Sequence, residues 1–498
     1  MSSSDLKQAR AIIDIGSNTV RLVIYGGPPR APVVLLNEKV AAKLGKGIGE
    51  TGKLSDKSQD AALKALTRFR ALLHLKGIVR VDAVATAAVR DATNGAQFLE
   101  RVRSLGLEPR LLSGEEEALT SASGVLGAFP DAHGMVADLG GGSLELIEIG
   151  EGTCRHGVSL PLGTLMLPGL RASGARAFHR QASRILNSAA WHPAPGGTLY
   201  LVGGSLRAFA KYAMRRSNWP FEDPHGFELA APEAESIAAA LADRRSVTEA
   251  VPGISASRLA ALPDAAQLLR ALMRKVRPDR IVFSSWGLRE GLVWRSLSRA
   301  AQAQDPLIAG IAAFAERYRV ATATASMVTG WCASASAAKD LSRRENLLLA
   351  ATLLALASCR LEPNLRAEHA TDWAMRKRWI GLGSEDRVLL ASCLLANSGR
   401  MAVPEAWLRS ARPERIYEAQ GWGLAIRLCR RFSDCTVDAL GGSSLIAGDG
   451  KLQLGVGAAF AELMSGDVER DLRGLAAHLG LEASWRILPV GGNLAAHG

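Results

Sequence analysis

The pattern of apolar and polar residues repeats once along the chain. Residues 11–25, AIIDIGSNTVRLVIY, are two apolar, β-rich runs joined by GSNT, and this pattern predicts a strand, a tight turn and a returning strand. Residues 134–150, GMVADLGGGSLELIEIG, follow the same pattern, with an offset of 124 residues between Asp14 and Asp138. A repeat at that distance predicts two copies of one domain, each opening with a hairpin that carries an aspartate at its turn.

Helical and strand-like patterns alternate after each hairpin. Residues 58–75 and 97–105 have helical spacing, residues 81–89 are strand-like, and a helix is expected to begin near Ser113. Residues 198–202 and 280–283 predict further strands, with a helix starting at Ser205. This alternation predicts α/β domains with a mixed, mainly parallel sheet.

Strand patterns almost vanish after residue 302. Alanine- and leucine-rich helical stretches run to about residue 400, and the last part mixes a helix with short β-like runs. We therefore predict four segments: two related α/β domains at 1–132 and 133–301, a helical domain at 302–412, and a small α+β domain at 413–498.

Composition indicates a globular protein with a basic excess. Sixty Lys and Arg against 48 Asp and Glu give a net charge of +12, which suits a polyanionic partner, although solubility alone could explain it. The six cysteines form no CxxC pair and predict free thiols of a reducing compartment. No apolar leader core and no run of 18 apolar residues occurs, so the sequence predicts a cytoplasmic protein that does not bind a membrane.

The first hairpin turn has the residues of a phosphate-binding loop. Asp14 ends a strand, where its carboxylate could reach a metal-bound water. The turn that follows, Gly16, Ser17, Asn18 and Thr19, could offer backbone N–H groups to phosphate oxygens. A plain hairpin turn is the alternative, because Ser-Asn is good turn chemistry.

The second turn is a stronger candidate. Gly140, Gly141 and Gly142 let the backbone approach an anion closely, Ser143 adds a hydroxyl, and Asp138 is a candidate magnesium ligand. The motif is neither a P-loop, since no Gly-Lys-Ser/Thr follows, nor a Rossmann GxGxxG. Two such turns facing each other would hold one phosphate chain from both sides.

SGEEEA, residues 113–118, supports two interpretations. Ser113 and Glu116 fit a capping box, which is the structural interpretation. An ionised glutamate at a helix start could also orient a water molecule against phosphorus.

Several basic residues could bind phosphate. Arg90 and Asn94 follow a strand end, where arginine can hold phosphate oxygens bidentately. Arg207 opens a basic stripe with Lys211 and Arg215, for which a solvated helix face is the alternative. A basic, glycine-rich loop carries lysines that either cover a polyanion as a lid or face solvent: Lys39, Lys43, Lys46 and Lys53.

The order of these motifs resembles the exopolyphosphatase / guanosine pentaphosphate phosphohydrolase (Ppx/GppA) family in its long form. The matching pieces are IDIGSNTVRL, ATAAVRDATN, SGEEEA, VADLGGGSLEL, SLPLGTLML, LVGGSLR and SSWGLREGL. The resemblance implies duplicated ribonuclease H-like domains, the fold shared with actin, sugar kinases and chaperone ATPases. It also implies that the remainder is an HD-like helical domain and a small terminal domain.

The resemblance implies exopolyphosphatase activity: magnesium-dependent, or manganese-dependent, in-line attack of water on the terminal phosphate of inorganic polyphosphate. It implies Glu116 as the residue that activates the water, with Glu117 a second candidate among Glu115–Glu117. Asp14, Asp138 and Glu145 would hold the metal. The implied phosphate-binding residues are Gly16, Ser17, Asn18, Thr19, Arg90, Asn94, Gly140, Gly141, Gly142, Ser143, Gly204, Ser205 and Arg207.

Two alternatives stay open at this point. The same residues could hydrolyse the 5′ γ-phosphate of guanosine pentaphosphate (pppGpp), with ppGpp as product, or the protein could bind such nucleotides without turnover as a regulator. The family resemblance implies a homodimer and no nucleic-acid partner. In the helical domain, TLLALAS (residues 352–358) stands where a histidine–aspartate pair would be expected, so a structural or substrate-channelling role is predicted there.

Overall fold

The structure, a computed structural model, describes residues 9–188, 195–243, 250–333 and 342–489. The chain divides into two compact units, Met1–Gln304 and Asp305–Gly498. The first eight residues, on which the expected absence of a leader depends, lie outside the described residues. None of the helices in the described ranges is long and apolar enough to cross a membrane. The four-segment division remains a prediction.

The first lobe of the first unit, lobe I, is built on the first hairpin. Its elements are β1 (Arg10–Ile15), β2 (Val20–Gly26), β3 (Val33–Val40), α2 (Ile48–Thr51), α3 (Asp56–Leu75), β4 (Arg80–Ala85), α4 (Ala87–Asp91), α5 (Gly95–Arg103), β5 (Pro109–Leu111) and α6 (Gly114–Ala128).

The second lobe, lobe II, begins with the second hairpin. Its elements are β6 (Gly134–Leu139), β7 (Leu144–Gly150), β8 (Thr153–Leu160), α7 (Leu167–Ala172), α8 (Ala175–Ser188), β9 (Thr198–Val202), α9 (Gly204–Arg216), β10 (Glu228–Ala230), α10 (Ala231–Ala242), α11 (Ala256–Val276), β11 (Arg280–Phe283), α12 (Leu288–Arg295) and α13 (Arg299–Gln302).

The two sheets share one topology, which confirms the duplication. The strand order is β3-β2-β1-β4-β5 in lobe I and β8-β7-β6-β9-β11-β10 in lobe II. In each, the first three strands pair antiparallel and the next two add in parallel. The sheets are mixed as predicted, but the expectation that they are mainly parallel was wrong, because each hairpin continues into a third antiparallel strand.

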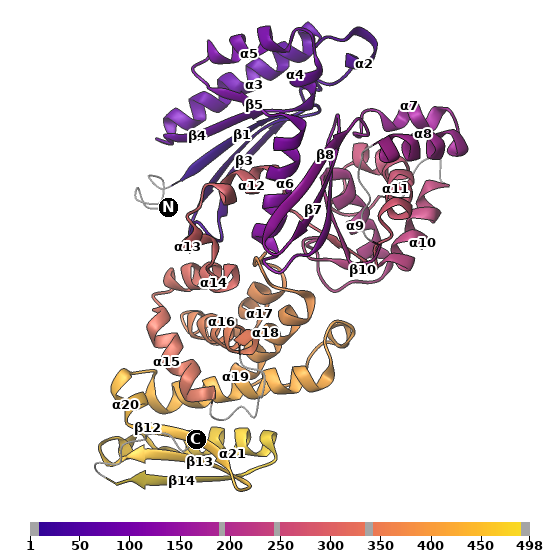
Figure 1. Cartoon of the computed structure of the whole chain (residues 1–498). Coiled ribbons are helices and arrows are strands. Elements are labelled where there is room, and N and C mark those ends of the chain that lie inside the picture. Colours follow the sequence, from indigo (N-terminus) through magenta and orange to yellow (C-terminus); the bar gives the residue numbers. More distant parts are fainter. Residues whose placement is uncertain (1–8, 189–194, 244–249, 334–341, 490–498) are drawn as a thin grey trace. The chain divides into compact units, whose positions relative to one another are not determined.

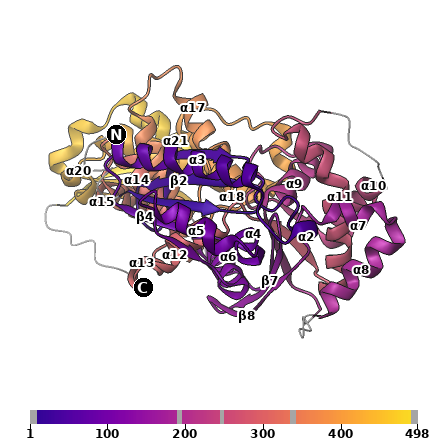
Figure 2. The ribbon, with the colours of Figure 1, turned by 90° about the horizontal axis from the view of Figure 1, so that it is seen from above.

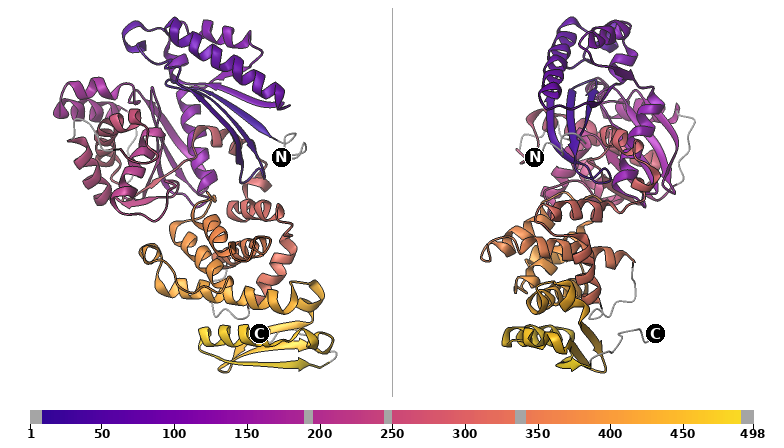
Figure 3. Two further views of the ribbon diagram at one scale, coloured as in Figure 1. Left: turned by 180° about the vertical axis from the view of Figure 1, so that it is seen from behind. Right: turned by 90° about the vertical axis from the view of Figure 1, so that its left-hand side faces the viewer.

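Helices cover the outer face of each sheet. In lobe I, α3 and α5 enclose a core with the inward side chains of β1, β2 and β4, and Figure 2 shows α3 crossing this sheet. In lobe II, the core lies between the sheet and α8–α11, on the side of the sheet away from lobe I (Figure 3). The residues predicted as one strand at 81–89 divide into β4 and the short helix α4, because β4 ends where its parallel partner β1 ends.

The second unit consists of helices followed by a small sheet. Its elements are α14 (Pro306–Glu316), α15 (Thr322–Ala333), α16 (Ser342–Ser358), α17 (Arg366–Met375), α18 (Ser384–Asn397), η1 (Glu405–Arg409), α19 (Pro413–Ser433), α20 (Val437–Gly441), β12 (Ser443–Gly448), β13 (Lys451–Gly457), η2 (Ala458–Leu463), α21 (Gly466–Leu479) and β14 (Glu482–Leu488). Within this unit, α19 packs against α18 on one side and α21 on the other (Figure 1). The change from helices to short strands agrees with the sequence pattern.

Helices α6 and α12 lie between the two sheets of the first unit (Figure 1). Chain segments from both lobes meet here, because α12 follows the last strand of lobe II and packs against β1 and the core of lobe I. The helices approach so closely that glycine is required. A Cβ on Gly291 would lie 1.7 Å from the carbonyl oxygen of Thr120, and one on Gly124 would lie 2.3 Å from that of Gly287.

Replacing Gly291 by alanine should therefore destabilise the first unit. The added Cβ would force α12 away from α6, and overpacking of this kind costs about 2 kcal/mol. We expect Gly291→Ala to lower the melting temperature by several degrees, measured by calorimetry. Gly169→Ala is the control, since a Cβ there meets nothing within 4 Å on an exposed helix. Equal melting temperatures for both variants would contradict the close packing of α6 and α12.

Candidate functional site

The two predicted turns have the same backbone geometry. The amide of Gly16 donates to the carbonyl of Thr19 at 3.0 Å, and the amide of Gly140 donates to that of Ser143 at the same distance. Each turn follows directly on the strand that carries the aspartate. Because the hairpins share one register, Asp14 pairs with Arg21 across β1 and β2, as Asp138 pairs with Glu145 across β6 and β7.

The repeat extends beyond the hairpins in the structure. Lys43 and Gly45, after β3, donate their amides to the carbonyls of Asn18 and Ser17. After β8, the amides of Gly163 and Leu165 donate in the same way to the loop at residues 140–142. The sequence pattern did not show this part of the repeat. Lys43 and Gly45 are 120 residues from Gly163 and Leu165, whereas the two aspartates are 124 residues apart, because the segments between turn and loop differ in length.

The two turns face each other directly. A Cβ on Gly141 would come within 3.0 Å of the Ser17 Cβ, and one on Gly142 within 2.9 Å of the Ser17 hydroxyl oxygen. Glycine is therefore needed at these positions, because the opposite turn occupies the space of a side chain. This close approach confirms the prediction that the two hairpins face each other.

A cavity of about 710 Å³ lies between the turns. Its lining includes most of the predicted site residues: Asp14, Gly16, Ser17, Asn18, Thr19, Glu117, Asp138, Gly140, Gly141, Gly142, Ser143, Glu145, Gly204, Ser205 and Arg207. The structure thus brings together residues from positions 14 to 207 of the sequence. Glu116, Arg90 and Asn94 do not line this cavity.

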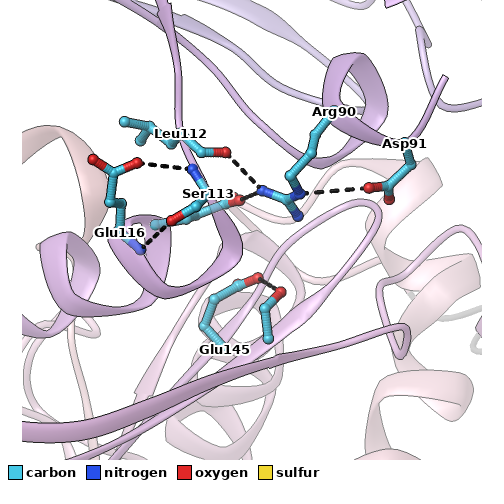
Figure 4. A network of polar contacts seen from close by, with 8 residues as sticks. Arg90, Asp91, Leu112, Ser113, Glu116 and Glu145 are labelled. Carbon is cyan, nitrogen blue, oxygen red and sulfur yellow. Dashed lines mark hydrogen bonds and ion pairs between the residues drawn. The ribbon is translucent and has the colours of Figure 1, made fainter. Parts of the chain in front are cut away.

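The side chain of Glu116 caps the N-terminus of α6. Its carboxylate accepts a hydrogen bond from the backbone amide of Ser113 at 2.9 Å, its own amide donates to the Ser113 hydroxyl, and Arg110 pairs with it at 3.3 Å. The amide of Ser113 lowers the pKa of Glu116. Figure 4 shows Glu116 turned back to Ser113, away from Arg90 and Glu145. Glu116 thus forms the capping box that the structural interpretation predicts, and it does not line the cavity.

Glu117, one residue further along α6, does face the cavity. Its side chain is 12% exposed against 47% for Glu116. Burial raises the pKa of Glu117 to about 7, although the hydrogen bond and the charge of Arg90 lower it, and the neighbouring Asp138 and Asp14 raise it further. A carboxylate with this pKa can both hold and accept a proton near neutral pH.

Arg90 positions Glu117 instead of lining the cavity. Its Nη1 donates to the Glu117 carboxylate at 3.0 Å and to the carbonyl of Leu112 at 3.1 Å, while its Nε pairs with Asp91 (Figure 4). Asn94 also has a structural contact: its side chain donates to the carbonyl of Leu54 and accepts from the Leu54 amide. For both residues, local hydrogen bonds occupy the groups that we expected to bind phosphate.

The carboxylates in the cavity repel one another. Burial raises the pKa of Glu145 well above its usual range, and the charges of Glu117 and Asp138 raise it further, while the Ser159 hydroxyl donates to it at 3.0 Å. Burial also raises the pKa of Asp138, to which the Ser121 hydroxyl donates. A cation bound beside these carboxyl groups would reduce the repulsion and favour their ionised form.

Five cationic side chains line the same cavity: Arg21, Lys39, Arg207, Arg258 and Arg289. Only Arg207 was predicted as a site residue, although Lys39 was considered as part of a lid. Removal from water lowers the pKa of Arg207 to about 10, and the charges of Arg289 and Arg258 lower it further. Arg289 donates to Asp14 at 3.0 Å, and its neighbour Glu290 accepts from the Tyr25 hydroxyl at 2.6 Å.

Residues 23–300, more than half of the chain, match the model of the Ppx/GppA phosphatase family. The chain belongs to this family. It is 27% identical over 307 residues to exopolyphosphatase 1 of Mycobacterium tuberculosis, an alignment that covers 58% of this chain and 88% of the relative. It is 31% identical over 169 residues to exopolyphosphatase 2 of the same species, over 32% of this chain and 53% of the relative.

Solved structures of Ppx/GppA proteins share the fold. The Aquifex aeolicus family member superposes with a TM-score of 0.51 at 25% sequence identity, over 58% of this chain and 97% of that structure. An exopolyphosphatase from Cytophaga hutchinsonii has a TM-score of 0.51 at 24% identity, also over 58% and 97%. The α/β architecture of the first unit is thus that of the Ppx/GppA proteins.

The remaining cations of this Ppx/GppA site carry weak sequence signals. Arg21 and Arg289 lie within the motifs that carry the family resemblance, but nothing local distinguishes them from surface arginines. The pairing of Asp14 with Arg21 in the first hairpin could have predicted Arg21 as a site residue. Residues that face each other on paired strands lie on the same side of the sheet. Arg258, near the start of α11, is brought to the cavity only by the packing of that helix.

The cavity fits a magnesium ion held partly by substrate. Asp14, Asp138 and Glu145 line it together and supply the carboxylate oxygens that magnesium prefers. Within the described part of the chain, however, no three His, Cys, Asp or Glu side chains converge closely enough to form a metal cage. Magnesium typically takes one or two carboxylates and completes its shell with water and phosphate oxygens, so this donor set suits a metal that binds with a phosphate chain.

Proposed function

We propose that this protein is an exopolyphosphatase that hydrolyses the terminal phosphate of inorganic polyphosphate. The observation that carries the proposal is the charge of the cavity: five cations and four carboxylates around one space enclosed by two glycine-rich turns. The cations suit a polyanionic chain, and the carboxylates suit a metal ion and a water molecule. The relatives named exopolyphosphatase support the same activity.

We assign the activation of water to Glu117 in place of Glu116. In the proposed reaction, the water oxygen attacks the terminal phosphorus as the bond to the bridging oxygen breaks. The carboxylate of Glu117 receives the proton, and the chain leaves one phosphate shorter. Arg90 holds Glu117 in place, and the amides of the two turns bind phosphate oxygens. Magnesium, or manganese, bound at Asp14 and Asp138 with support from Glu145 would neutralise phosphate charge.

The cellular location and the oligomeric state are further parts of the proposal. All six cysteines are free, which suits the reducing cytoplasm. A homodimer follows from the family resemblance alone. The HD-like character of the helical domain is likewise proposed from that resemblance. A structural or substrate-channelling role is proposed for this domain because TLLALAS, residues 352–358, stands where a histidine–aspartate pair would be expected.

The proposal is tested by phosphate release from long-chain polyphosphate, assayed with malachite green. We expect release that requires magnesium and stops when the metal is chelated. Guanosine pentaphosphate is assayed in parallel, since the same residues could remove its 5′ γ-phosphate. No release from either substrate, together with tight nucleotide binding, would show that the protein is a regulator and would overturn the proposal.

The adjacent glutamates provide a matched pair of variants. Glu117→Gln removes the proton acceptor, so we expect kcat on polyphosphate to fall by about 10³-fold with substrate binding retained. Glu116→Gln makes the same chemical change one residue away and keeps an oxygen for the helix cap, so its kcat should stay within about threefold of the wild type. The reverse outcome would return the role to Glu116.

Arg90→Gln should change the pH profile. Arg90 lowers the pKa of Glu117, so its removal raises that pKa above about 7, and less of the carboxylate is ionised at neutral pH. The acid limb of kcat/KM against pH should move up by about 1 pH unit, with activity recovering toward pH 9. Asp91→Asn is the control, because Asp91 contacts Arg90 but not Glu117. An equal loss at every pH would contradict the positioning role.

A further inference from the structure

A row of charged side chains crosses the sheet of lobe I at one level. Asp14 on β1 faces Arg21 on β2, and Arg21 faces Lys39 on β3. All three line the cavity, so they lie on the same face of the sheet. With strands about 4.8 Å apart, the row leads from the centre of the site outward over about 10 Å. Lys39 lies at its exposed outer end.

The equivalent row of lobe II has the opposite character. Asp138 faces Glu145, and Glu145 faces Ser159, at the positions that correspond to Asp14, Arg21 and Lys39. The lobe II row thus consists of two carboxylates and a hydroxyl, whereas the lobe I row consists of Asp14 followed by two cations. If the terminal phosphate of a polyphosphate substrate binds at the carboxylates, the next phosphates of the substrate would lie along Arg21 and Lys39.

The cations along this path are available to a ligand. Among the described residues, Arg289 is the cavity cation that forms an ion pair with a cavity carboxylate, Asp14. The side chains of Arg21, Lys39, Arg207 and Arg258 line the cavity without such an ion pair. The Nε of Arg21 is buried and lacks a partner. From lobe II, the Arg258 guanidinium lies over the start of α9, where a Cβ on Gly204 would come 3.1 Å from its Nη2.

Lys39 and Arg258 come from opposite lobes and repel each other. Partial burial lowers the pKa of Lys39, and among the neighbouring charges that of Arg258 lowers it most. Both side chains line the cavity, and an anion bound near both of them would offset this repulsion.

The lining also disfavours a nucleoside at this end. No Phe, Tyr, Trp or His occurs among the described lining residues, so no ring is present on which a base could stack. Arg258 is flanked in the lining by Ser255, Ser257 and Ala261. Small polar groups and cations suit a linear phosphoanhydride chain better than a planar base.

We propose that Lys39 and Arg258 form a subsite for the phosphates behind the scissile one, so that the enzyme selects long inorganic chains over short chains and nucleotides. This inference rests on the proposed function and adds the residues that determine its substrate preference.

The test compares kcat/KM for long-chain polyphosphate with kcat/KM for tripolyphosphate in the full chain. Lys39→Ala and Arg258→Ala should each lower the value for the long chain about tenfold more than the value for tripolyphosphate, mainly through KM. Each variant should also show a shallower dependence of log kcat/KM on log salt with the long chain, because fewer ions are displaced on binding. Lys39→Arg and Arg258→Lys should restore most of the preference.

Lys53→Ala and Arg215→Ala serve as controls, since both residues are exposed and outside the cavity lining. They should keep the wild-type preference for chain length. Equal losses on long and short substrates in Lys39→Ala and Arg258→Ala, or no loss, would overturn the subsite while leaving the proposed function intact. A wild-type protein that releases no phosphate from polyphosphate would instead overturn the proposed function itself.

Discussion

The central constraint on the first unit is that many charged side chains line one cavity, and most of them have no ion-pair partner there. Four carboxylates and five cations line the same space, yet only Asp14 and Arg289 form a direct ion pair across the two groups among the described residues. Holding like charges together costs folding free energy, which the surrounding apolar cores must offset. Binding of a polyanion and a cation would offset this cost, which agrees with the proposed polyphosphate substrate and metal ion.

The duplicated hairpin explains how this charge is arranged. Two copies of one backbone give two equivalent rows of positions that face each other, and glycine at residues 141 and 142 lets the turns meet. Side chains then distinguish the copies, with Arg21 in one where Glu145 stands in the other. The close contact of α6 with α12 joins segments of both lobes, and Arg90 holds the Glu117 side chain through a hydrogen bond.

Much of the fold was predictable because local patterns and tertiary structure agree. The hairpins, their turns and the repeat of the domain follow from apolar periodicity and turn residues, and the structure confirms them. The third antiparallel strand of each lobe was missed; in β3 the short apolar run VVLL is followed by the polar residues NEK, and every residue of the strand is partly buried or exposed. The change from β4 to α4 was missed because Val89 and its alanine neighbours suit a buried helix as well as a strand.

The sequence by itself determined which turns can approach phosphate, which aspartates precede them, and the family to which the chain belongs. Only the tertiary structure placed Glu116 at the helix cap and Glu117 at the cavity. Successive residues on a helix point about 100° apart, so one carboxylate caps the helix while the next reaches the cavity. The contact of Arg90 with Glu117, and the presence of Lys39 and Arg258 in one cavity, also follow only from the tertiary structure. Contacts between distant segments are set by packing and not by local sequence.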